Sequence, residues 1–186
     1  TMKYDYILKI IRKLKARYGT QDVYELCKRM GIIINSHPMG THPKAGKGFF
    51  TYRSRIKVIT VNSDLPKIVQ RFIVAHELGH AVLHFGRGTQ MFSDLVLFDE
   101  NAVTEKEANL FAAEILMDDE DVIGYLKGGL SFFETASALN VPAELLDFKL
   151  RIMRMKGYVL GLAPITADSK FLKDLQVPEN HDLDPA

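Results

Sequence analysis

The sequence predicts an α+β fold, in which a small antiparallel sheet is combined with long helices and a series of shorter helices follows. Two apolar, β-branched runs at residues 49–52 and 56–61, separated by three polar residues, are typical of a β-hairpin. Helical periodicity then runs through residues 66–85 and again through residues 104–117. Beyond these, the helical segments are short and are interrupted by glycine and proline.

The region before the hairpin is predicted to contain two helices, a strand and a loop. Apolar side chains recur at helical spacing in residues 4–18 and 22–30, and a glycine follows each segment. Residues 32–34 are three isoleucines, which predict a buried strand. Residues 36–47 contain two prolines and two glycines and are predicted to form a loop.

The region after the hairpin is predicted to be mostly helical. Pro66 suits the first turn of the helix over residues 66–85. Residues 87–102 are a mixed connection, in which the apolar run 96–98 is a candidate edge strand. The last ten residues are polar and are expected to be mobile. The C-terminal helices are predicted at residues 104–117, 118–127, 131–139 and 142–155.

These elements predict three parts: a core with N-terminal helices at residues 1–117, a helical subdomain packed on it at 118–157, and a C-terminal tail at 158–186. Within the subdomain, residues 133–146 resemble a helix-turn-helix. Its second helix begins at Ala143 with an acidic start, whereas a DNA-reading helix needs basic or amide side chains there. Because carboxylates repel phosphate, we expect packing or substrate docking here and no direct nucleic-acid binding.

The composition indicates a soluble globular protein, with 47% hydrophobic and 25% charged residues in a chain of 186. Lys plus Arg number 24 and Asp plus Glu number 23, so the charges nearly balance and give no overall attraction to nucleic acid or membrane. The single cysteine, Cys27, excludes an intramolecular disulfide and is expected to be buried. No run approaches the roughly 20 apolar residues that span a bilayer. We therefore expect a cytoplasmic protein.

The strongest chemical signal is the sequence His76-Glu77-Leu78-Gly79-His80. On a helix, residues four apart project from one face about one turn apart, so the two imidazoles can bind one metal ion. Glu77 is rotated by about 100° from His76. A carboxylate at that position can take a proton from water held by the metal and pass it to a leaving amine. The motif predicts a zinc peptidase with His76 and His80 as ligands and Glu77 as the catalytic base.

A catalytic zinc needs a third protein ligand. His84 extends the four-residue spacing but lies about 12 Å along the helix axis from His76, which is too far for a shared ion. We therefore expect His84 either to contact one of the metal-binding residues or to serve in packing. The carboxylates of the next long helix are Glu105, Glu107 and Glu114. From spacing alone, two alternative roles are equally expected for Glu107: a metal ligand, or the closing residue of a capping box that begins at Thr104.

Two blocks of the sequence resemble the ImmA/IrrE metallopeptidase family. Residues 71–84, RFIVAHELGHAVLH, match its R-F-x-x-A-H-E-L-G-H-x-x-L-H helix. Residues 105–117, EKEANLFAAEILM, match its later E-A-N-x-F-A-x-x-L-L-M-P helix, except that Asp118 stands where the family usually has proline. The likeness covers roughly residues 30–155. It implies a zincin-like core followed by helices similar to a helix-turn-helix, with Glu107 as the third zinc ligand.

The same resemblance implies a zinc-dependent endopeptidase that cuts a helix-turn-helix transcriptional repressor, relieving repression of a mobile element or of stress genes. The alternative is a non-proteolytic regulatory protein with a structural zinc, which binds a repressor or DNA through its helical subdomain. Two imidazoles and one carboxylate also suit manganese or iron. The side chain that stabilises the oxyanion is not identifiable from sequence, and Arg71 points off the ligand face and is expected to pair with a carboxylate.

Overall fold

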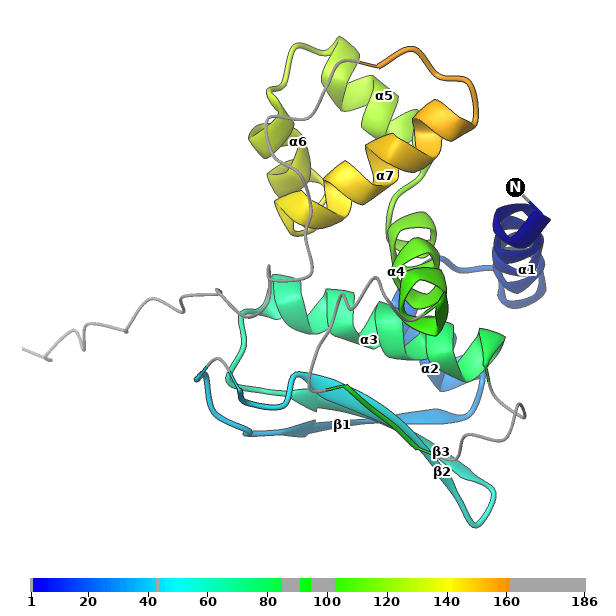
Figure 1. The fold of residues 1–186 in the computed structure, drawn as a ribbon, viewed down its shortest axis with the longest axis vertical. Helices are drawn as coiled ribbons and strands as arrows, with labels where there is room; N and C mark the ends of the chain where they lie inside the picture. Colours follow the sequence, from blue (N-terminus) through cyan, green and yellow to red (C-terminus); the bar gives the residue numbers. More distant parts are fainter. Residues whose placement is uncertain (1, 43, 85–90, 95–102, 161–186) are drawn as a thin grey trace, which may run out of the picture.

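The computed structural model describes residues 2–42, 44–84, 91–94 and 103–160. Seven helices and four strands lie in these segments, and Figure 1 shows their arrangement. In chain order they are α1 (Met2–Tyr18), α2 (Val23–Arg29), β1 (Ile32–His37), β2 (Gly48–Arg53), β3 (Ile56–Asn62), α3 (Lys67–Leu83), β4 (Met91–Asp94), α4 (Val103–Leu116), α5 (Asp119–Lys127), α6 (Phe132–Ala138) and α7 (Ala143–Met155). The predicted α+β content is confirmed.

The strands form one mixed sheet in the order β1-β3-β2-β4. The predicted hairpin is confirmed, because β2 and β3 pair antiparallel. β1 lies parallel to β3, so the sheet is not purely antiparallel as predicted. β1 is also less buried than predicted: alternate side chains of an edge strand face opposite ways, and Ile33 is 55% exposed. The edge strand beside β2 is β4, and the predicted strand at residues 96–98 lies outside the described residues.

α3 lies across one face of the sheet (Figure 1). Gly48 on β2 permits this close approach, because a Cβ at that position would overlap the side chain of Ile73 and lie 2.9 Å from the Thr60 carbonyl oxygen. The apolar side chains that face the sheet from α3, including Val69 and Ile73, are buried. The sheet therefore provides a fixed support for the helix that carries the histidines.

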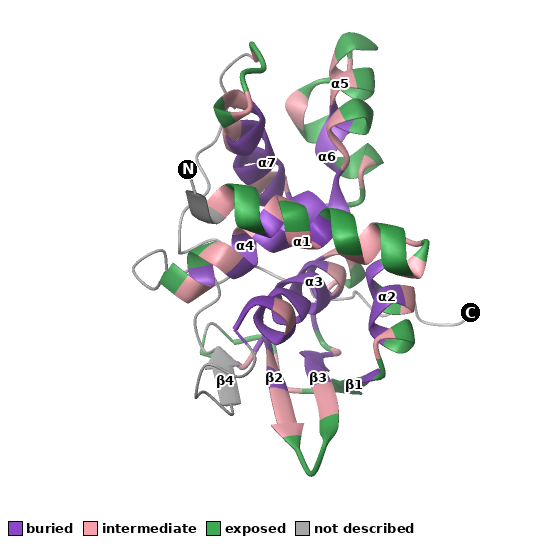
Figure 2. Cartoon of the chain, turned by 90° about the vertical axis from the view of Figure 1, so that its right-hand side faces the viewer, coloured by how far each residue is buried: buried purple, intermediate pink, exposed green. Residues whose placement is uncertain are grey.

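α4 packs on the side of α3 that faces away from the sheet, and α1 packs on α4 in turn (Figures 1 and 2). α2 packs between β1 and α3 and buries Cys27, as predicted. Burial raises the pKa of the Cys27 thiol to about 12, so the thiol stays protonated at neutral pH. α3 thus lies between the sheet and α4, which explains why its residues are buried almost throughout.

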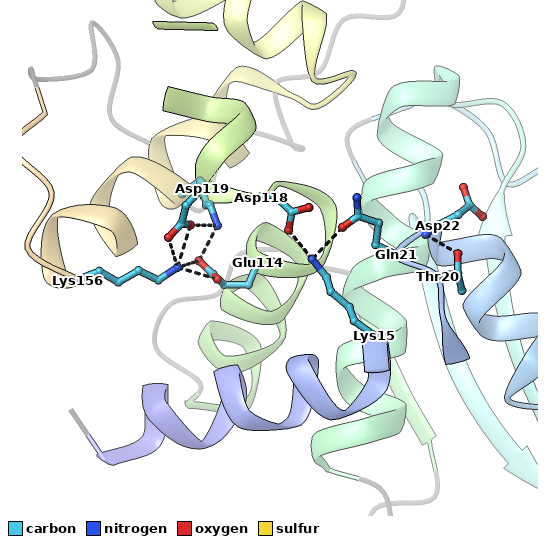
Figure 3. A network of polar contacts seen from close by, with 9 residues as sticks. Lys15, Thr20, Gln21, Asp22, Glu114, Asp118, Asp119 and Lys156 are labelled. Atoms are coloured by element: carbon cyan, nitrogen blue, oxygen red, sulfur yellow. Dashed lines mark hydrogen bonds and ion pairs between the residues drawn. The ribbon is translucent and has the colours of Figure 1, made fainter. Parts of the chain in front are cut away.

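α5, α6 and α7 lie beyond α4, and the buried side chains of α7 belong to the same apolar cluster as those of α3 and α4. An ionic network joins α4, α5 and the C-terminal half of α7: Lys149 and Lys156 contact the carboxylates of Glu114 and Asp119 at 2.6–3.0 Å. Figure 3 shows the Glu114, Asp119 and Lys156 part of this network. Lys149 is only 1% exposed. Its ammonium is buried because two carboxylates compensate for lost hydration.

Candidate metal centre

α3 aligns three histidines at four-residue spacing, His76, His80 and His84, and all three are buried. Their rings contact one another in sequence, with centroids 4.8 Å apart for the first pair and 5.1 Å apart for the second. Polar rings on so apolar a helix need polar partners. The partners come from α4, which is why the packing of α3 against α4 determines the site.

Glu105, on the first turn of α4, contacts the Nε2 atoms of the first two histidines. Its Oε2 lies 3.2 Å from His76 Nε2, and its Oε1 lies 3.3 Å from His80 Nε2. The two Nε2 atoms are themselves 3.0 Å apart. His76, His80 and Glu105 therefore converge as a compact, buried set of three donor groups.

These separations fit a zinc ion. Ligands at about 2.0–2.1 Å from zinc in a tetrahedron are separated from one another by roughly 3.3 Å. The 3.0 Å separation of the two Nε2 atoms is close to one edge of such a tetrahedron, and Glu105 places one carboxylate oxygen 3.2 Å from His76 Nε2 and the other 3.3 Å from His80 Nε2. Among the described residues the set offers three donors, the number that a catalytic zinc site takes from the protein.

The outer nitrogen of His76 supports the same interpretation. His76 Nδ1 lies 2.8 Å from Asn109 Oδ1, and because an amide oxygen only accepts, the proton is on Nδ1. In the neutral ring, Nε2 then carries a lone pair directed at the cluster. That lone pair faces His80 Nε2 at 3.0 Å and can bind a cation shared with His80 and Glu105. The donor set therefore fits a bound metal cation.

The structure differs from the prediction of Glu107 as the third ligand. Glu107 Oε2 lies 3.0 Å from His84 Nε2, and Glu105 occupies the place beside His76 and His80. In the structure, the compact set of donors is therefore His76, His80 and Glu105. A sequence signal exists for Glu105: Asn109 follows four residues later, so a ligand and the residue that hydrogen-bonds His76 lie on one face of α4.

Electrostatics favour the ionised form of Glu105. Burial opposes ionisation, but when the His76 and His80 rings are protonated their hydrogen bonds and charge outweigh burial and lower the pKa of the carboxyl group. A metal ligand must be deprotonated. Glu105 therefore presents a carboxylate to the cluster at neutral pH.

A model of one protein family, described as the IrrE N-terminal-like domain of Peptidase_M78, matches residues 27–151. The chain belongs to the ImmA/IrrE metallopeptidase family. It is 36% identical over 146 residues to immunity region protein 2 of Bacillus phage phi105, covering 78% of this chain and 90% of that protein. It is 32% identical over 144 residues to the metallopeptidase ImmA of Bacillus subtilis strain 168, covering 72% and 77% of the two chains. The predicted resemblance is thereby confirmed.

The family match extends from α2 into α7 and includes both the histidine helix and the Glu105 helix. Between these two helices, Gly79 allows an unusually close contact. A Cβ at Gly79 would lie 3.2 Å from Ala108 Cα and 3.2 Å from Phe111 Cβ. Because Gly79 precedes His80 directly, this contact brings α4 near enough for Glu105 to reach both rings.

Glu77, the predicted base of the family motif, is buried on α3 directly after His76. Arg71 lies more than one turn earlier and donates from Nη1 to the carbonyl oxygens of Leu139 and Asn140, at 3.3 and 2.8 Å. It therefore binds the C-terminal end of α6, where a cation is favourable, and not a carboxylate as predicted.

Two further histidines are exposed: His37 ends β1 and His42 lies in the loop after it. Among the helices that the structure describes, none is long and apolar enough to cross a membrane.

Proposed function

We propose that this chain is a zinc-dependent endopeptidase that cleaves a helix-turn-helix transcriptional repressor, relieving repression of a mobile element or of stress genes. The observation that carries this proposal is the buried set of His76, His80 and Glu105, whose donor atoms lie close enough together to share one zinc ion. Membership in a metallopeptidase family supports peptide-bond hydrolysis. The phage relative is named for an immunity region, which supports a regulatory protein as substrate.

The chemistry follows from the positions of the side chains. Zinc, when bound, acts as a Lewis acid toward water and toward the substrate carbonyl group. Glu77 moves the proton: one carboxylate oxygen accepts it from the attacking water and returns it to the leaving amine. Because Glu77 is rotated by about 100° from His76, it lies beside the three donors without joining them. Asn109 accepts from His76 Nδ1 and so holds the His76 ring in the tautomer that ligation through Nε2 needs.

The arrangement also supports a zincin-like core, as the family resemblance implies. A mixed sheet carries the motif helix α3 across one face, and the following helix α4 supplies the third donor. Manganese or iron would use the same ligand types. Elemental analysis of protein purified without added metal decides between them, and we expect about one zinc per chain for a site of this kind.

The test compares cells that produce the wild-type chain with cells that produce Glu77→Gln. We expect new N-termini within a helix-turn-helix repressor only with the wild type, while both proteins keep zinc. Glu120→Gln is the matched control, because Glu120 is an exposed carboxylate on α5 and its loss should leave cleavage unchanged. Cleavage by Glu77→Gln at the wild-type rate would refute the mechanism. An intact repressor held in a stable complex by the wild type would instead favour the non-proteolytic regulator.

A further inference from the structure

We propose that His84 and Glu107 form a positioning pair that holds His80 in the tautomer and orientation needed for metal binding. This inference rests on the proposed metal site and adds a role for two residues outside the ligand set. His84 Nδ1 lies 3.0 Å from His80 Nδ1, and His84 Nε2 lies 3.0 Å from Glu107 Oε2. The three side chains thus form a continuous line that ends at the metal-facing nitrogen of His80.

The proton positions along this line follow from the chemistry of each atom. A carboxylate oxygen only accepts, so the proton shared with Glu107 is on His84 Nε2. In a neutral imidazole the other nitrogen, His84 Nδ1, is then an acceptor. His80 Nδ1 must therefore be the donor across the 3.0 Å contact. That leaves the lone pair of His80 on Nε2, which faces His76 Nε2 and Glu105.

The opposite assignment would prevent metal binding. If His84 carried its proton on Nδ1, His80 Nδ1 would have to accept it. The neutral His80 ring would then carry its own proton on Nε2 and direct an N–H group at the other donors. Glu107 excludes this assignment, because its carboxylate holds the His84 proton on Nε2. The carboxylate therefore acts on the ligand through the intervening ring.

The placement of His84 supports a positioning role and not a ligand role. It directly follows α3, and its backbone N–H donates to the His80 carbonyl oxygen at 3.0 Å. The ring is buried, and the Glu107 side chain is 16% exposed. Its Nε2 is held by a carboxylate from a second helix, while its Nδ1 contacts the ligand ring. The same logic applies to His76, whose Nδ1 proton is fixed by Asn109 from α4.

The first readout is zinc affinity of the full chain, measured by competition with a chromophoric chelator. Loss of such an outer contact to a ligating histidine typically weakens metal binding about 10–100-fold. We expect a weakening of this size for His84→Ala and Glu107→Ala. Glu107→Gln keeps an oxygen that accepts from His84 Nε2, so its loss should be clearly smaller. His42→Ala and Glu120→Gln remove exposed groups of the same two types and should bind zinc as the wild type does.

The second readout is the tautomer of each ring, from nitrogen-detected NMR of the zinc-loaded protein. We expect His80 protonated on Nδ1 and His84 on Nε2 in the wild type, and a mixed His84 population in Glu107→Ala. Circular dichroism of the metal-free variants checks folding. If His84→Ala does not fold, the Glu107 variants carry the test, because Glu107 is partly exposed.

The outcomes separate this inference from the proposed function. Wild-type affinity in Glu107→Ala and His84→Ala, or the opposite tautomers in the wild type, would overturn the positioning role. Failure of the wild type itself to bind zinc would overturn the metal site. Zinc binding that depends on His84 and Glu107 in a chain that cuts no repressor would uphold the pair and refute the peptidase proposal.

Discussion

Replacing Gly79 by alanine tests the close contact of α3 with α4 that brings Glu105 to the histidines. Two effects oppose each other. Alanine within a helix stabilises by about 0.5–1 kcal/mol relative to glycine. The added Cβ, however, would lie 3.2 Å from Ala108 Cα, a backbone atom that moves only if α4 moves. Overpacking of this kind costs about 1–3 kcal/mol. We therefore expect a net destabilisation of about 0.5–2 kcal/mol.

The matched control is Gly124→Ala in α5. Gly124 is also within a helix, but a Cβ there would meet no atom within 4 Å. We expect this variant to be more stable than the wild type by about 0.5–1 kcal/mol, since only the helix-propensity effect remains. The two substitutions make the same chemical change, so the sign of the effect isolates the α3–α4 contact.

Gly79→Ala and Gly124→Ala are compared in two assays: urea unfolding of the metal-free protein gives stability, and competition with a chelator gives zinc affinity. Metal sites accept ligand distances within about 0.2 Å of their ideal values. A shift of α4 by a few tenths of an ångström would move Glu105 beyond that range, so Gly79→Ala should also bind zinc more weakly. If Gly79→Ala is stabilised as much as Gly124→Ala and binds zinc normally, the contact does not position Glu105 and the reasoning fails.

Four further predictions follow from individual contacts. Glu105→Ala removes a ligand, so zinc affinity measured by chelator competition should fall by more than the roughly 100-fold limit of an outer contact; normal affinity would exclude Glu105 from the site. Lys149→Met leaves two buried carboxylates with one fewer cation and should cost about 3–5 kcal/mol in urea unfolding. For Asp119, burial opposes ionisation, but hydrogen bonds from Lys149 and Lys156 outweigh it and lower the pKa of the carboxyl group. The stabilisation is therefore present above its ordinary pKa of 3.8 and lost as the pH falls through the lower folded value, and Asp119→Asn should flatten that acid limb of the stability curve. Arg55→Gly should raise the free energy of unfolding by about 1 kcal/mol, because Arg55 has a φ of 67° in the hairpin turn, and an unchanged melting temperature would contradict this.

Most of the helices were predictable, because each combines a periodic apolar face with an identifiable end. α1 and α2 end just before Gly19 and Gly31, which have φ values of 62° and 67°, the left-handed conformation that glycine adopts without strain. The β2–β3 hairpin was predictable from two short β-branched runs. The parallel pairing of β1 with β3 was not, because the residues that join two strands do not specify which neighbour a strand will pair with.

In the candidate site, too, some features were predictable from the sequence and others were not. His76 and His80 belong to one helix, so their mutual geometry follows from the helical repeat of that segment alone. Glu105 and Glu107 are two residues apart on another helix, and either could be directed at the histidines until the crossing of α3 and α4 is known. The resemblance pointed to Glu107, whereas in the structure Glu105 lies beside His76 and His80; a sequence pattern contains both glutamates and does not distinguish their directions.

By itself, the sequence identified the motif of two histidines with an adjacent glutamate, and the family of the chain. These depend on local spacing and on residue identity. Only the tertiary structure decided that Glu105 joins the histidines while Glu107 contacts His84, and that Lys149 is buried between carboxylates. The physical reason is that such contacts join segments 23 to 35 residues apart, and their geometry depends on how closely two helices approach at a residue such as Gly79.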